Sequence, residues 1–459
     1  MGTKLAKVTS KPPSRPTRWA NRIMAGVCAL SLAAGATILA VSNIGLLPPH
    51  PTTVNATLYV DPPPAAVAPV IGLDRVNPAQ TVNAEQIRQG LTALGRPGAG
   101  ALSYCVTDLN GQEIAATPGY VLKVPASSWK VLTAMAVLSA YGSNHRFPTT
   151  TVASSTGVVI VGGGDPYLTS YTPILNGHNR LDDLADQTVA GLQAAGRTTV
   201  TLGYDDTLFA GPGWNNHWTA DLEPEVAPIA ALSVDSRGSG MYSSTSLVAA
   251  REFANLLTAR GITVTSIRAE TAPSAATELG YVESATLGRI VHRVLQRSDN
   301  FASEILFRHV SVAAGGDGSN ASARTALADY LVSRGVWTEG MTVSDGSGLS
   351  LSNRTTACAL AAAIRAAFSD PLLGDVLAGL PVAGYSGTLA DRFDDPSSFA
   401  ARGVVRAKTG THDHERTLTG YAQTTSGALV VFSFMFDQLG DHGGAVYWMD
   451  EAAALLARS

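Results

Sequence analysis

The sequence predicts an α/β (α+β) fold, in which an antiparallel sheet is flanked by helices and a β-rich region is inserted between its two halves. Three apolar runs at hairpin spacing and a closing helix fill residues 403–458, and an earlier hairpin occupies residues 101–117. Residues 151–270 differ, with short β-like runs and two helical stretches. Together these patterns indicate one sheet made from both chain ends, with a subdomain inserted between them.

Length and charge narrow the class of protein. At about 150 residues per domain, 459 residues suggest more than one domain. Hydrophobic residues make up 45% of the chain, which excludes disorder throughout. The net charge of −4 is an average. Residues 1–60 hold six basic residues and no acidic one, which leaves 26 basic and 36 acidic residues, or −10, downstream. An acidic body argues against a nucleic-acid partner, because such binding needs basic patches.

The N-terminus has the pattern of an exported membrane protein. Residues 1–22 form a basic segment that we expect in the cytoplasm, and residues 23–47 carry no charge. As a helix, that uncharged run spans roughly 37 Å, enough for a hydrocarbon core of about 30 Å. We therefore expect a transmembrane signal anchor in the cell membrane, a proline-rich linker at 48–83 and an extracytoplasmic body. The alternative is a protein secreted after signal cleavage.

The body begins with a helix and a hairpin. Residues 84–96 have helical spacing, and residues 101–108 and 113–117 are typical of two strands joined by an Asn-Gly turn. Residues 127–140 are apolar nearly all round, which predicts a buried helix. The further helical stretches are 181–195, 246–260, 284–312 with a break near Ser298, and 444–458.

The C-terminal strands complete the predicted sheet. They are GVVRAKTG (403–410), TLTGYAQT (417–424) and ALVVFSFMF (428–436). The body is thereby divided into the first part of one domain at 84–150, the inserted region at 151–270 and the second part of the domain at 271–459.

Cysteine and histidine patterns indicate neither a metal nor a cofactor. No CxxC or HExxH spacing occurs. His412 and His414, on either side of Asp413, offer two ligands without a third, so we expect a solvated hairpin turn there. Cys105 and Cys358 remain for an oxidising compartment, either as a disulfide or as two buried free thiols.

Ser127 and Lys130 open the predicted buried helix at a spacing that places both on one helix face. A serine there can hydrogen-bond a lysine one turn later, and the helix N-terminus offers N–H groups to an oxyanion. The plain alternative is a serine N-cap beside a surface lysine. Lysine is scarce, however. Beyond residue 22 the chain has only Lys123, Lys130 and Lys408.

Two further short motifs follow in the chain. Ser298-Asp299-Asn300 is by itself a turn or a helix N-cap, and Lys408-Thr409-Gly410-Thr411 is by itself a charged strand end. Together and in this order, SxxK, SDN and KTG form the signature of penicillin-binding proteins and class A β-lactamases.

The sequence resembles the D-alanyl-D-alanine carboxypeptidase/endopeptidase family, the type-4 low-molecular-mass penicillin-binding proteins of class C, over most of residues 84–459. This implies a serine β-lactamase/DD-peptidase-like domain, and the 171 residues between Ser127 and Ser298 imply inserted domains. One departure is His412-Asp413-His414, where the family usually has Leu after KTGT. The matching segments are PASSWKVLT, VGGGDPYL, SDNFASEIL, DGSGLS, LPVAGYSGTL and AKTGT.

The resemblance implies a role for each motif. Ser127 would be the nucleophile and Lys130 its base, kept neutral by burial and by the like charge of Lys408. Ser298 would carry a proton from Lys130 to the leaving nitrogen, and Asn300 would hold the substrate's amide side chain. The remaining contacts would come from the KTG strand: Lys408 and Thr409 binding the substrate carboxylate together with Gly410, and the N–H groups of Ser127 and Thr411 forming the oxyanion hole.

The implied function is a serine D,D-peptidase that cleaves D-Ala-D-Ala, and in some cases D,D cross-links, in peptidoglycan stem peptides, with β-lactams as covalent inhibitors. One alternative is a β-lactamase, but the ExxLN segment that carries the class A deacylating Glu does not occur. Another is a non-catalytic cell-wall binding module, against which the intact motifs argue. An α/β-hydrolase is disfavoured because the chain has no GxSxG.

Overall fold

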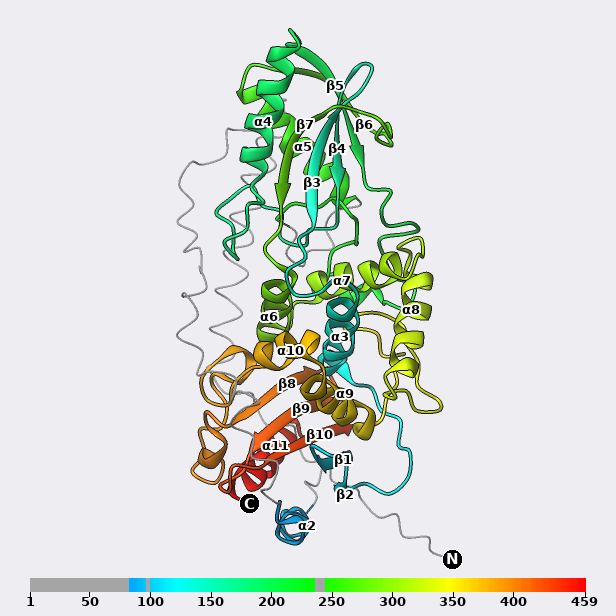
Figure 1. Cartoon of the computed structure of the whole chain (residues 1–459). Coiled ribbons are helices and arrows are strands. Elements are labelled where there is room, and N and C mark those ends of the chain that lie inside the picture. Colours follow the sequence, from blue (N-terminus) through cyan, green and yellow to red (C-terminus); the bar gives the residue numbers. More distant parts are fainter. Residues whose placement is uncertain (1–81, 96–99, 236–243) are drawn as a thin grey trace, which may run out of the picture. The chain divides into compact units, whose positions relative to one another are not determined.

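The structure, a computed structural model, describes residues 82–95, 100–235 and 244–459, which all belong to the unit Pro62–Ser459 (Figure 1). The expected basic segment, signal anchor and nearly all of the linker lie outside these residues. Among the described helices, no single one is long and apolar enough to cross a membrane. One bent pair, Ala357–Ser369 with Pro371–Gly379, reaches that length and composition only jointly.

Both ends of the body meet in the first sheet, as predicted. Its strand order is β2-β1-β10-β9-β8, and every neighbouring pair is antiparallel. Ala101 of β1 lies opposite Asp437 of β10, so the first hairpin pairs directly with the last strand. The strands are β1 Ala101–Asp108, β2 Glu113–Ala116, β8 Val405–Thr411, β9 Arg416–Gln423 and β10 Leu429–Asp437.

Helices cover both faces of this sheet, and β10 shows why its sequence is apolar without interruption. Phe432, Phe434 and Phe436 lie in one core with helices α2 (Ala84–Ala93) and α11 (His442–Arg458). Val431 and Met435 lie in the other core. Successive side chains of a strand point to opposite faces, so a strand that is covered on both sides needs apolar residues throughout.

The second core is helical, and α3 (Lys130–Tyr141) lies within it with nine buried residues, which confirms the predicted buried helix. The helix begins later than expected, because Ala126–Trp129 form a 3₁₀ turn before it. The other helices of this layer are α6 Leu287–Arg297, α7 Asn300–Ala313, α8 Asn320–Ser333, α9 Ala357–Ser369 and α10 Gly374–Gly379; shorter 3₁₀ turns are Ala220–Leu222, Pro371–Leu373, Gly387–Leu389 and Phe399–Ala401.

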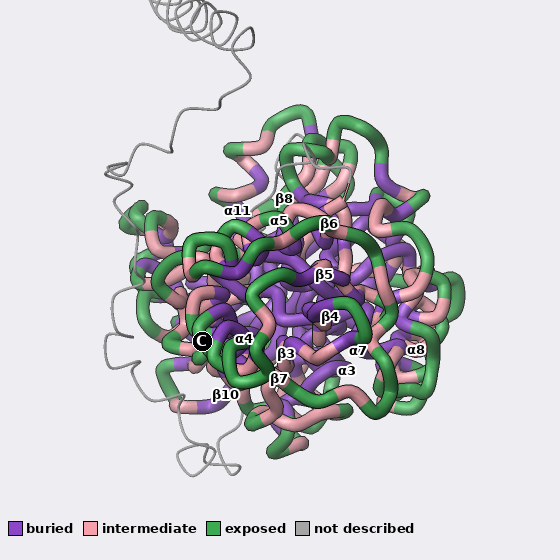
Figure 2. Tube along the Cα trace, turned by 90° about the horizontal axis from the view of Figure 1, so that it is seen from above, coloured by how far each residue is buried: buried purple, intermediate pink, exposed green. Residues whose placement is uncertain are grey.

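A second sheet is built from the middle of the chain, in the order β6-β5-β4-β3-β7. β4, β5 and β6 pair in parallel, whereas β3 pairs antiparallel with both β4 and β7. Its buried residues pack with helices α4 (Leu181–Ala194) and α5 (Thr245–Ala259), and they line the interior in Figure 2. The strands are β3 Pro148–Ala153, β4 Gly157–Gly162, β5 Thr199–Asp205, β6 Thr263–Ala269 and β7 Glu278–Glu283.

Two cross-links tie distant parts of the first domain together. Cys105 of β1 and Cys358 of α9 form a disulfide across 253 residues, which resolves the alternative that the sequence left open. The buried Lys123 Nζ donates to Asp437 Oδ1 of β10 at 2.6 Å. Lys123 therefore has a structural partner, although the sequence analysis assigned it no role.

Candidate active site

The three sequence motifs converge on two buried lysines. Lys130 Nζ lies 2.9 Å from Ser127 Oγ and donates to Asn300 Oδ1 at 2.7 Å. Lys408 Nζ donates to Ser298 Oγ at 2.9 Å. Two hydrogen-bonded pairs of motifs thus lie side by side, SxxK with Asn300 and KTG with Ser298, where α3, the α6–α7 turn and β8 meet.

Close backbone packing positions Ser127. Its predecessor Ala126 has φ 46°, in the left-handed region. A Cβ at Gly348 would lie 2.0 Å from the Ala126 carbonyl oxygen. A Cβ at Gly410 would lie 2.1 Å from Thr417 Oγ1 and 2.8 Å from the Pro125 carbonyl oxygen. The structure therefore gives Gly410 of the KTG motif a packing role, because only glycine lets β8 lie this close to the turn that carries Ser127.

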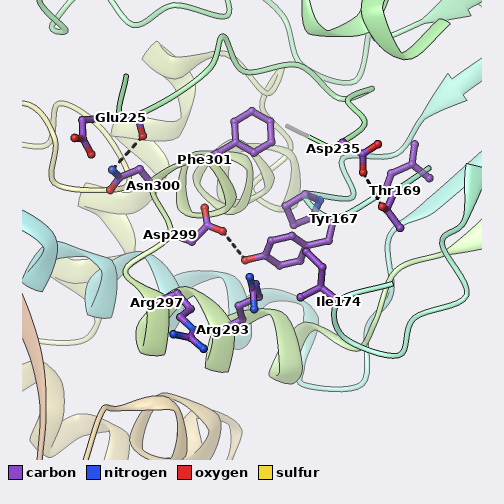
Figure 3. Close-up of a pocket in the computed structure, with 12 residues that line it drawn as sticks. Tyr167, Thr169, Ile174, Glu225, Asp235, Arg293, Arg297, Asp299, Asn300 and Phe301 are labelled. Atoms are coloured by element: carbon purple, nitrogen blue, oxygen red, sulfur yellow. Dashed lines mark hydrogen bonds between the residues drawn. The ribbon is translucent and has the colours of Figure 1, made fainter. Parts of the chain in front are cut away.

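The Ser298–Asn300 turn separates α6 from α7, as the predicted helix break required. Ser298 ends α6 with φ 57°, and Asp299 caps α7 through a hydrogen bond from the Ala302 N–H to Oδ1 at 3.0 Å. This reversal directs Ser298 and Asn300 toward the lysines, whereas Asp299 accepts a hydrogen bond from Tyr167 OH at 3.0 Å (Figure 3).

A pocket with a cavity volume of about 250 Å³ lies beside this turn (Figure 3). Tyr167, from the VGGGDPYL segment, forms part of its wall, and the Arg293 guanidinium lies 5.5 Å from the centroid of the Tyr167 ring. Residues of the inserted region and of the SDN motif therefore line the same pocket. Its lining residues are Pro166, Tyr167, Leu168, Thr169, Ile174, Glu225, Asp235, Arg293, Arg297, Asp299, Asn300 and Phe301.

Burial sets the charge of Lys130, which is fully enclosed. It lowers the pKa of Lys130 to about 8, against the opposing effect of nearby carboxylates, of which Asp345 and Glu304 are the strongest. The like charge of Lys408 was expected to be a second cause of the lowered pKa of Lys130. In the structure the repulsion between the two lysines changes the pKa of Lys408 instead. Burial is the larger cause and the charge of Lys130 the second, and together they lower the pKa of Lys408 well below its usual range.

The partners of Lys130 determine where a neutral amine would direct its lone pair. Asn300 Oδ1 and the Ser347 carbonyl oxygen, both 2.7 Å from Nζ, can only accept hydrogen bonds. Asn300 Nδ2 donates to the Glu225 carbonyl at 3.2 Å, which keeps Oδ1 turned toward the lysine. Of the three partners, only the Ser127 hydroxyl can donate. The lone pair of neutral Lys130 therefore faces the Ser127 proton.

The other predicted site residues also lie near the two lysines, but some of them make contacts other than those that their expected roles require. Ser298, expected between Lys130 and the leaving group, hydrogen-bonds Lys408. Asn300, expected to bind substrate, holds Lys130. Thr409 Oγ1 lies 2.7 Å from Thr388 Oγ1, and Thr411 is exposed at the end of β8.

The loop 345–350 and Glu304 also contribute to the site, although no sequence pattern predicted a role for them. Asp345 accepts hydrogen bonds from the Gly348 and Ser350 N–H groups at 2.8 and 2.6 Å and from Trp218 Nε1 at 3.0 Å. This shapes the loop that presents the Ser347 carbonyl to Lys130. The sequence did contain a sign of these two residues, because each is an acidic residue among small or apolar ones in the DGSGLS and SDNFASEIL segments. A charge in such surroundings is costly to bury without partners, so a buried acidic residue there indicates a specific set of contacts.

The two histidines of the loop after KTGT contact different parts of the backbone. His412 Nε2 lies 2.8 Å from the Gly348 carbonyl oxygen, and His414 Nδ1 lies 3.3 Å from that of Leu439. Across the described part of the chain, no group of three or more His, Cys, Asp or Glu side chains could hold a metal ion.

Comparison with known proteins identifies the family of the chain. The family model described as "D-Ala-D-Ala carboxypeptidase 3 (S13) family" matches residues 97–246 and 239–456. A carboxypeptidase of Mycobacterium tuberculosis is 32% identical over 450 residues, which cover 93% of this chain and 96% of that protein.

The fold is also known. Penicillin binding protein 4 from Haemophilus influenzae superimposes with a TM-score of 0.68 at 18% identity, covering 83% of this chain and all of that one. A second structure of that protein, in complex with a β-lactam, gives a TM-score of 0.62 at the same identity and coverage. The chain described here belongs to the D-Ala-D-Ala carboxypeptidase 3 (S13) family.

Proposed function

We propose that this chain is a serine D,D-peptidase that cleaves the terminal D-Ala-D-Ala bond of peptidoglycan stem peptides through an acyl-enzyme on Ser127. One observation carries the proposal: Lys130 Nζ lies 2.9 Å from Ser127 Oγ, while its two other partners can only accept hydrogen bonds. An amine held in this way is oriented to take the serine proton, which serine needs because its hydroxyl is a weak nucleophile.

Acylation follows from these contacts. Neutral Lys130 removes the Ser127 proton as Oγ attacks the carbonyl carbon, and the N–H groups of Ser127 and Thr411 stabilise the oxyanion. The substrate's carboxylate binds Lys408 and Thr409, which restores the positive charge that burial disfavours on Lys408. The proton that Lys130 took from Ser127 then passes through the hydroxyl of Ser298, which is hydrogen-bonded to Lys408, to the departing D-alanine nitrogen, and Lys130 is left neutral. Water then hydrolyses the ester.

Penicillin labelling tests the nucleophile. β-Lactams should acylate the same serine, and the complex of the Haemophilus protein with a β-lactam supports testing them here. We expect a fluorescent penicillin to label the wild type and not Ser127→Ala. Ser128→Ala is the matched control, since Ser128 is fully buried and hydrogen-bonds Thr417 Oγ1 at 2.7 Å. Labelling that persists in Ser127→Ala contradicts the proposal.

A second candidate substrate is the D,D cross-link between two stem peptides, which an endopeptidase would cleave. Digestion of purified cross-linked muropeptides, with the products weighed by mass spectrometry, separates the two activities. Release of D-alanine alone identifies a carboxypeptidase, and conversion of dimers to monomers identifies an endopeptidase. A β-lactamase would instead turn over nitrocefin continuously.

We further propose that residues 23–47 anchor the body to the outer face of the cell membrane. The uncharged run and the basic cluster before it support this placement. The full chain should sediment with membranes, whereas a chain that starts at residue 48 behind a cleavable signal should be released. Recovery of the full chain in the soluble exported fraction overturns the anchor and supports cleavage.

A further inference from the structure

We propose that Glu304 is a positioning residue for Lys130: it holds the Ser347 peptide that orients the lysine amine, and its charge acts on that amine. The inference deepens the proposed function, because it rests on the role of Lys130 as the base for Ser127. Among the described residues, no hydrogen bond joins Glu304 directly to Lys130 or Ser127.

The link consists of two contacts on a single residue. Glu304 lies on α7 and is only 1% exposed. Its Oε1 accepts hydrogen bonds from the Gly346 N–H at 3.0 Å and from the Ser347 N–H at 2.6 Å. The carbonyl oxygen of the same Ser347 accepts from Lys130 Nζ at 2.7 Å. Moving the Ser347 backbone would therefore move one of the three partners that aim the amine at Ser127.

The surrounding loop is held firmly enough to transmit this contact. The peptide between Gly346 and Ser347 is fixed at both of its polar ends. Its carbonyl oxygen accepts from Thr133 Oγ1 at 2.6 Å and from Ser303 Oγ at 2.9 Å, and its N–H is the one bound by Glu304. A Cβ at Gly346 would lie 2.2 Å from Phe307 Cβ, so the loop packs directly against α7. The only carboxyl group among the described contacts to this peptide is that of Glu304.

Glu304 also acts on Lys130 through its charge. Burial, and then the neighbouring Asp345, raise the pKa of Glu304 to about 8, against the effect of Arg308 and of its hydrogen bonds with Ser347. Oε1 already accepts two N–H groups, whereas Oε2 is buried without a hydrogen-bond partner among the described residues. The proton of neutral Glu304 is therefore held on Oε2, and the contacts to the loop are kept in both charge states.

The coupling has a definite sign. As an anion, Glu304 favours the ammonium form of Lys130 and so raises the pKa of Lys130, as do Asp345, Asp299 and Glu225. The like charge acts on the other lysine, because Lys130 lowers the pKa of Lys408. Because Lys130 and Glu304 titrate in the same pH range, their protons are lost as a coupled pair. Replacing Glu304 by a neutral isostere should let Lys130 become neutral at lower pH.

Two variants separate the contact from the charge. Glu304→Gln retains an amide oxygen for both N–H groups and removes the charge. Its acylation rate with a penicillin should keep a plateau within about threefold of the wild type. Near pH 8, where Glu304 of the wild type ionises, the variant should reach that plateau at a pH lower by roughly half a unit, while the rates below pH 7, where Glu304 is already neutral, should coincide. Glu304→Ala leaves both N–H groups without an acceptor, and its plateau should fall at least about tenfold.

The control is Asp450→Asn in α11, which neutralises another buried carboxyl, one that accepts from Arg392 at 2.5 Å. Its whole pH profile, including the region near pH 8, should coincide with that of the wild type. If Glu304→Gln acylates with an unshifted profile, the inference is wrong and the proposed function stands. If the wild type itself is not acylated, the proposed function fails and this inference with it. Thermal unfolding of each variant identifies any loss that comes from misfolding, and Glu304→Gln then decides the question.

Discussion

Acylation of Ser127 should depend on pH through Lys130, and the structure gives the size of the effect. The base works only as a neutral amine, and burial lowers the pKa of Lys130 from 10.5 to about 8. At pH 7 roughly one lysine in ten is then neutral, compared with about one in three thousand at the unshifted pKa. The shift therefore makes the base about 300-fold more available, equivalent to about 3 kcal/mol.

The assay is the second-order rate constant of penicillin acylation, measured by stopped flow between pH 5.5 and 9. Because the protonated form is inactive, the rate should rise about tenfold per pH unit below pH 7 and level off near pH 8. Lys130→Arg should lower the rate by roughly two to four orders of magnitude at every pH, since guanidinium does not deprotonate. A wild-type rate that is flat from pH 6 to 8, or a Lys130→Arg rate within tenfold of wild type, would refute the reasoning.

Three further outcomes follow from the structure. Replacing Cys105 and Cys358 by Ala should lower the free energy of unfolding by about 2–4 kcal/mol in denaturant titrations, and a loss below 1 kcal/mol would contradict a stabilising disulfide. Gly410→Ala should reduce penicillin labelling at least tenfold, because its Cβ meets a β9 hydroxyl at 2.1 Å, whereas Gly440→Ala, with no atom within 4 Å, should label normally; equal labelling rejects the packing argument. Tyr167→Phe, which removes one hydrogen bond to the SDN turn, should slow acylation about three- to tenfold, and an unchanged rate argues against that coupling.

Local patterns predicted much of the fold. The continuous apolar run of β10 and the apolar helix α3 both follow from burial on more than one side, which the sequence shows directly. The break near Ser298 also follows from local residues, since Asp299 is a preferred helix N-cap. The shared site was predicted from the SxxK, SDN and KTG motifs in this order and from the family resemblance that they carry.

Features that depend on long-range contacts were less accessible from the sequence. The state of Cys105 and Cys358 depends on where α9 packs against β1, 253 residues away along the chain. The parallel pairing of β4, β5 and β6 depends on crossover helices and not on the strand residues alone. The contacts of Lys130 with Ser347 and of Ser347 with Glu304 likewise require the loop 345–350 to reach α3.

Peptide mapping of the acyl-enzyme tests the central claim most directly. The exported body would be incubated briefly with a penicillin, digested and sequenced by tandem mass spectrometry, with the peptide that contains Ser127, Ser128 and Lys130 followed for added mass. We predict one penicilloyl adduct, on the Oγ of Ser127. An adduct on Ser128 or on any other residue, or a fully folded protein that acquires none, would contradict the account.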